Sequence, residues 1–144
     1  MRKAYELWHL GPRPKAIAAL DEVLSRFGEA TGPALRVLVA YALASRGHSL
    51  RELGRDQEAM AAYDEVVRRF GEDTDPLLRE HVANAIGKRG LILEKAGCCE
   101  EAVAAYSNVV RRFGDATEPA LQRQVAVARK CRDRLLNQSP TDGR

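Results

Sequence analysis

The chain has 144 residues, a formal net charge of +3 and 30% charged side chains of both signs. This length suits one compact domain, and the weak net charge argues against a nucleic-acid binder, which usually carries a basic stripe. The sequence has no apolar run of 18 or more residues and no cleavable leader pattern, so it predicts no membrane span and, by default, a cytoplasmic location.

Residues 1–10 read as the second half of a longer helix, because they align with residues 44–53 and 87–96 at a period of 43. More than half of positions 28–70 are identical to positions 71–113, which is typical of stacked repeat units. A half repeat at the start fits either a chain that begins in this way or a piece of a longer array. The predicted domain, 1–137, divides into a half unit at 1–28, full units at 29–71 and 72–114, and a capping helix at 118–137, followed by a disordered tail at 138–144.

The second helix of each unit ends in a shared segment. Its three copies are Leu20–Gly28, Tyr63–Gly71 and Tyr106–Gly114. Its arginine pairs, such as Arg68 and Arg69, favour the negative end of the helix dipole, and a glycine then ends the helix. The turn before this helix is expected to use a left-handed glycine. The turn glycines are Gly11, Gly54 and Gly97.

Each full unit also has a long first helix that a proline opens, predicted from Pro33 to Leu53 and from Pro76 to Ala96. Asp75 is able to cap the second of these helices. A glycine inside a helix costs about 1 kcal/mol relative to alanine. Its recurrence at Gly47 and Gly90 therefore predicts close approach by the following helix.

The last helix carries Asp133 where the earlier units have glycine. A charged side chain at the close-contact position indicates that no further helix packs there, as at the polar end of a solenoid. We therefore expect about seven helices, the last of which caps the array. The apolar stripe of this capping helix consists of Leu121, Val125, Ala128 and Leu135.

The unit resembles the tetratricopeptide (TPR) repeat, which has a glycine in the first helix, a glycine in the turn, and alanine followed four residues later by an aromatic residue. These positions are Gly47, Gly54, Ala59 and Tyr63 in one unit and Gly90, Gly97, Ala102 and Tyr106 in the next. The resemblance implies an all-α fold, a right-handed superhelical solenoid of antiparallel helix pairs whose first helices line a concave groove that binds peptides or proteins. The units are longer than the usual length of about 34 residues, and Arg46 and Arg89 replace the leucine before the glycine.

In this register the inward face of the first helices is aromatic near the N-terminus and mildly basic beyond it. We expect partner contacts from Tyr5, Trp8, His9, Tyr41, Ser45, His48, Arg51, Asn84, Lys88, Leu91, Lys95, Lys130 and Arg134, with Glu52 and Glu94 as acidic members. The basic side chains are expected to hold an extended or acidic segment, and Tyr5, Trp8 and Tyr41 its apolar part. The alternative is a solvated face in which Trp8 packs against a missing half unit.

No catalytic or cofactor motif accompanies this surface. The sequence has no phosphate loop, dinucleotide fingerprint or zinc-protease motif, and its histidines are scattered at His9, His48 and His81. The cysteines supply neither the number nor the spacing of ligands that zinc requires, and we read them as reduced thiols; they are Cys98, Cys99 and Cys131. The sequence therefore predicts a protein that is not an enzyme and has no cofactor or metal.

The predicted function is non-enzymatic binding of a protein or peptide segment in the concave groove. The chaperone-tail clamp of some TPR modules is disfavoured, because Tyr5 and His48 stand where that clamp has asparagine. The alternative function is structural self-assembly, in which the half repeat at 1–10 stacks on another copy to form a homo-oligomer.

Overall fold

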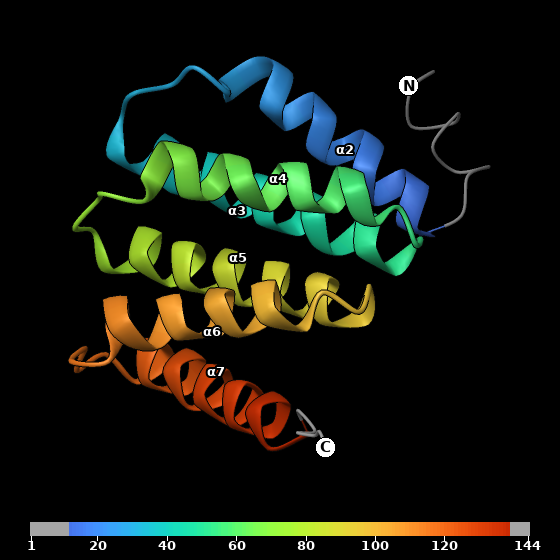
Figure 1. Cartoon of the computed structure of the whole chain (residues 1–144). Helices are drawn as coiled ribbons and strands as arrows, with labels where there is room; N and C mark the ends of the chain where they lie inside the picture. The colour runs from blue at the N-terminus through green and yellow to red at the C-terminus, as the bar shows by residue number, and fades with distance from the viewer. Residues whose placement is uncertain (1–11, 139–144) are drawn as a thin grey trace. The chain divides into compact units, whose positions relative to one another are not determined.

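The computed structural model describes residues 12–138, and this part of the chain is helical with no strand. Figure 1 shows the helices joined by short connections. They are α2 (Pro12–Phe27), α3 (Pro33–Glu52), α4 (Asp56–Phe70), α5 (Pro76–Lys95), α6 (Cys99–Phe113) and α7 (Pro119–Gln138). The expected all-α arrangement is confirmed. The remaining predicted helix, at 1–10, lies outside the described residues.

The helix ends agree with the predicted ends to within one residue. The two long helices end at Glu52 and Lys95, one residue earlier than predicted. The last helix runs from Pro119 to Gln138, so Gln138 is helical although the sequence pattern assigns it to the tail. The rest of the predicted tail, 139–144, lies outside the described residues.

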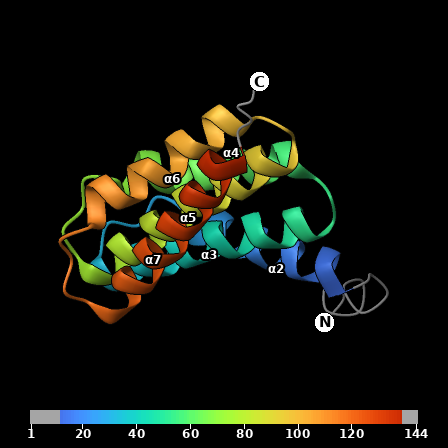
Figure 2. The ribbon, with the colours of Figure 1, turned by 60° about the horizontal axis from the view of Figure 1, so that its bottom comes forward.

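The chain divides between Arg69 and Phe70 into two compact units. The division falls close to Gly71, where the repeat pattern places a unit boundary. In the first unit, α2 packs against α3, and α3 runs antiparallel to both α2 and α4 (Figure 1). In the second unit, α5, α6 and α7 all pack against one another, and α7 lies beside both of the other helices (Figure 2). Consecutive helices within each unit therefore run antiparallel to each other (Figure 1).

The turns between first and second helices use left-handed glycine, as expected. Gly54 has a φ of 77° and Gly97 a φ of 84°. After Gly54, the amide of Arg55 donates to the carbonyl of Leu50 at 2.9 Å, which closes the end of α3. Because side chains rarely adopt this conformation, glycine is required at both turns. Gly11 lies outside the described residues.

Besides their favourable position at the end of the helix dipole, the arginine pairs make hydrogen bonds to the backbone. The guanidinium of Arg69 donates to the carbonyl oxygen of Gly28, and that of Arg112 donates to the carbonyl oxygen of Gly71 at 2.5 Å. Each acceptor lies just beyond the end of the preceding unit's second helix, where carbonyl groups lack intrahelical partners. The second arginine of each pair therefore binds a backbone carbonyl group 41 residues earlier in the chain.

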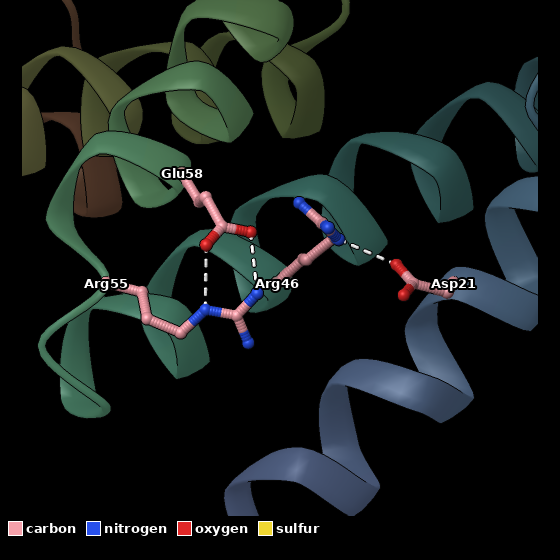
Figure 3. Close-up of polar contacts among 4 residues, drawn as sticks. All are labelled: Asp21, Arg46, Arg55 and Glu58. Carbon is pink, nitrogen blue, oxygen red and sulfur yellow. Dashed lines mark hydrogen bonds and ion pairs between the residues drawn. The ribbon is translucent and has the colours of Figure 1, made fainter.

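Ion pairs on the surface of the first unit explain one departure from the TPR pattern. Arg46, which replaces leucine, points from α3 to Asp21 of α2, with 2.6 Å between Nε and Oδ1 (Figure 3). Arg55 and Glu58 pair at the start of α4 through two hydrogen bonds of 2.8 and 2.7 Å. Exposed pairs of this kind contribute about 1 kcal/mol or less, so they adjust packing that apolar burial dominates.

Both long first helices begin at a proline, as predicted, but they differ in the residue before it. Pro76 follows Asp75, whose carboxylate accepts a hydrogen bond from the amide of Leu77 at 2.8 Å. Pro33 follows Gly32, which provides no side-chain cap. The cap that the sequence predicts is therefore present in α5 and is not formed by a side chain in α3.

Candidate partner-binding surface

In each repeat, a close contact between a glycine and a tyrosine holds the first helix against the second helix. A Cβ atom placed on Gly47 would lie 2.7 Å from Cε1 of Tyr63, and one on Gly90 would lie 2.6 Å from Cε1 of Tyr106. Both tyrosines are almost completely buried. The close approach predicted at the two glycines is confirmed. Because of this contact, each tyrosine hydroxyl lies near the residue one helical turn after the glycine.

In the second unit, that residue is Glu94, which joins three helices. The hydroxyl of Tyr106 on α6 donates to one carboxylate oxygen at 2.9 Å, and Arg134 of α7 donates to the other at 2.6 Å. The hydrogen bond from the Arg134 guanidinium lowers the pKa of Glu94. Burial of the carboxylate acts in the opposite direction, and the hydrogen bond from Tyr106 lowers the pKa further. Burial, followed by the bond to Glu94, raises the pKa of Tyr106, which keeps the hydroxyl protonated as a donor.

A small cleft lies beside this network, between α5 and α7. Three residues expected from the sequence line it on α5, namely Asn84, Lys88 and Leu91. The opposite side is formed by α7, including Gln124, Val127 and Cys131. The cleft volume of about 40 Å³ is enough for a few water molecules. Binding sites for small molecules usually measure about 300–1,000 Å³.

The basic residues near the cleft have different surroundings. Lys95 and Lys130 are exposed, whereas Lys88 is half-buried. Arg134 is exposed, but its guanidinium is bound to Glu94 of the same chain. An acidic ligand would therefore have to compete with Glu94 for the guanidinium of Arg134.

The equivalent surface of the first unit is formed by α3. Tyr41, with 57% of its surface exposed, and His48 stand out from this helix, while Ser45 is half-buried. Arg51, one turn after Gly47, is partly buried. Its Nε atom and the hydroxyl of Tyr63 are both buried without a hydrogen-bond partner among the described residues. The three remaining expected residues, Tyr5, Trp8 and His9, lie outside the described part of the chain.

Sequence reasoning missed two apolar or weakly polar residues of the cleft. Val127 has 58% of its surface exposed, and Cys131 is half-buried beside it. They stand 43 residues after Asn84 and Lys88, so extending the same register into the capping helix would have found both. Gln124 has no corresponding signal in the repeat.

Within residues 12–138, no group of three or more His, Cys, Asp or Glu side chains is arranged to hold a metal ion. None of the helices in this range is both long and apolar enough to cross a bilayer. His81 is half-buried on α5, and burial lowers its pKa, whereas His48 is exposed on α3. The thiols of Cys98, Cys99 and Cys131 are not joined by disulfides.

Comparisons with known proteins agree with this geometry. Residues 42–73 match the family model described as a tetratricopeptide repeat. This segment contains Gly47 and Tyr63, which form the glycine–tyrosine contact, and the left-handed Gly54. No curated protein and no solved structure gave a significant match to the chain. Tetratricopeptide repeats generally mediate protein–protein interactions, and residues 42–73 are similar to one such repeat.

Proposed function

We propose that this chain binds segments of a protein partner without catalysis. One proposed surface is the face formed by α5 and α7, and a separate one is the corresponding face of α3. The observation that carries the proposal is the cleft that brings Asn84, Lys88 and Leu91 together with residues of α7.

The chemistry of the cleft suits a peptide chain. Leu91 and the exposed Val127 offer apolar contact, and Asn84 and Gln124 offer amide donors and acceptors to a peptide backbone. Lys88 and the exposed Lys130 add positive charge. This combination supports a segment with apolar and acidic side chains, as the sequence predicts.

The test is selection of binders from a display library of random dodecapeptides, followed by affinity measurements on the selected peptides. Val127→Glu places a charge in the cleft and should weaken binding at least tenfold. Ala126→Glu is the matched control, because this exposed neighbour on α7 is not part of the cleft lining. Equal affinity of the two variants, or a library that yields no binder, would contradict the proposal.

The acidic character of the partner has a separate test. Lys88→Glu reverses a charge in the cleft and should weaken binding of acidic peptides and reduce the salt dependence of their affinity. An unchanged affinity at low salt would remove Lys88 from the binding surface.

The second candidate function is self-assembly through the half repeat at 1–10. That segment lies outside the described residues, so the proposal rests on the repeat pattern alone. Light scattering over a wide concentration range should reveal growth in mass if the chain stacks. A constant monomer mass would exclude this second function.

A further inference from the structure

Positive charge is concentrated on the last helix, α7. This helix carries five basic residues and one acidic residue, although the net charge of the whole chain is only +3. The rest of the sequence therefore carries a slight excess of acidic residues. The basic helix is also the one that forms a wall of the cleft in the second unit.

Helix stability and the repeat do not account for this concentration. Basic side chains stabilise the C-terminal end of a helix, but the last turn of α7 contains none. Lys130 and Arg134 are four residues apart, and like charges at this spacing are destabilising. At the positions of Arg123 and Lys130, the equivalent helix α5 has Glu80 and Gly87, so the packing of the repeat does not require a base there. Arg123 and Lys130 therefore point to an anionic partner.

The basic residues beside the cleft differ in whether the chain itself neutralises them. Arg134 is bound to Glu94, which occupies its guanidinium. Arg123 and Lys130 are exposed, and neither forms an ion pair or a side-chain hydrogen bond with another residue of the range 12–138. A carboxylate from a partner could bind either of these two without displacing an intramolecular contact.

Arg123 and Lys130 flank the exposed wall of the cleft. Val127 stands one turn after Arg123 and one turn before Lys130, so the three side chains project within about 60° of one another. The two bases are about 10 Å apart along the helix axis. Between them, Val127 and Leu91 of α5 line a cleft of about 40 Å³, which suits the end of a single apolar side chain.

We propose that Arg123 and Lys130 select a partner segment in which an apolar residue lies between two acidic residues. The apolar side chain packs against Val127 and Leu91 at the cleft, while one carboxylate binds Arg123 and the other binds Lys130. An extended chain advances about 3.3 Å per residue, so the two acidic residues stand about three positions apart.

The lining of the cleft favours a protein segment over a nucleic acid. Among the described residues that line it, Tyr106 is the aromatic one, and its ring is buried, so a nucleobase has no exposed ring on which to stack. This inference rests on the proposed function, because it names the chemistry of the partner that binds the face formed by α5 and α7.

The first test uses dodecapeptides selected on the wild-type chain, which should be enriched in Asp or Glu on both sides of an apolar residue. The tightest binder, the parent peptide, is resynthesised with blocked ends and with one or both acidic residues replaced by the corresponding amide. Each single replacement should weaken binding about threefold to fivefold. The affinity of the parent peptide should also fall as the salt concentration rises.

The second test reverses the charges on α7. Arg123→Glu and Lys130→Glu should each weaken binding of the parent peptide about tenfold. Arg129→Glu is the matched control, because it makes the same change at an exposed residue that points about 100° away from Lys130, and it should change the affinity less than about twofold. Ala126→Glu leaves both bases in place and should weaken binding less than either reversal. A peptide with lysine in place of one acidic residue should bind again to the variant that this residue faces and not to the other.

The outcomes separate this inference from the proposed function. Selected peptides without acidic enrichment, or equal losses in Arg123→Glu and Arg129→Glu, would overturn the inference; peptide binding at the cleft would stand if Val127→Glu still weakened it. A library that yields no binder would overturn both. Tighter binding of a labelled single strand of twelve nucleotides than of the parent peptide would overturn the assignment to a protein segment. Restored binding of the lysine peptide to one variant would support the inference, and the amide replacements test it even if a variant does not fold.

Discussion

The two units of this chain share a packing contact and differ in what is built beside it. Gly47 with Tyr63, and Gly90 with Tyr106, bring the helices together with nearly the same geometry. The hydroxyl of Tyr106 is bonded to the carboxylate of Glu94, whereas that of Tyr63 lies beside the guanidinium of Arg51. A repeated scaffold can therefore place an equivalent hydroxyl beside a carboxylate in one unit and beside a guanidinium in the other. The residue that differs between the copies decides which environment results.

The largest expected effect comes from disrupting the glycine–tyrosine contact that the two units share. Gly90→Val would drive a branched side chain into the buried ring of Tyr106 and should reduce the free energy of unfolding by about 3 kcal/mol. Gly87→Ala is the control on the same helix, since a Cβ there meets no atom within 4 Å, and it should stabilise by up to about 1 kcal/mol. Urea denaturation measures both. Equal stability of the two variants would show that the close contact is unimportant.

A smaller effect should come from the network found in the second unit. Glu94→Gln removes the charge that binds Arg134 and should cost about 2 kcal/mol at pH 7. Because the folded-state pKa of Glu94 is lowered from 4.5, its contribution is present above that pH and is lost as the pH falls through the folded value.

Denaturation at pH 7 and at pH 3 checks the pH dependence. The difference in stability between wild type and Glu94→Gln should shrink at the lower pH. Glu101→Gln, at an exposed position on α6, should cost much less at pH 7. A difference between wild type and Glu94→Gln that is the same at both pH values would contradict the assigned role of the carboxylate.

The smallest expected change in stability comes from removing the hydroxyl of each tyrosine in turn. Tyr106→Phe removes a hydrogen bond to a carboxylate and should destabilise by about 1 kcal/mol, whereas Tyr63→Phe removes a buried hydroxyl that is not bonded to a carboxylate among residues 12–138 and should cost clearly less. Thermal denaturation of the two variants in parallel measures the contrast. Equal losses of stability would mean that Tyr63 has an acceptor in solution.

Much of the fold could be predicted from the sequence, because the controlling features are local or periodic. Prolines mark the starts of α3, α5 and α7, and Gly54 and Gly97 mark turns that require a left-handed residue. The packing of tyrosine on glycine followed from a helix-breaking residue that recurs at one register. These features depend on backbone geometry, which a single sequence reveals directly.

The polar contacts between distant residues could not be predicted in the same way. The repeat pattern predicts only a favourable position for Arg112 at the end of its own helix, yet its side chain reaches the carbonyl group of Gly71. It also marked Arg134 as a ligand contact, although the guanidinium is bound to Glu94. The rotamer of a long side chain depends on neighbours that arrive from elsewhere in the chain, so register alone does not determine it.

The bond between Arg69 and Gly28 also has a consequence for biosynthesis. During translation, the end of α2 leaves the ribosome well before Arg69, which lies 41 residues later. A nascent chain that has not yet reached Arg69 lacks the guanidinium that fastens this end of α2 to α4. The end of α2 therefore gains this contact only after α4 has been synthesised.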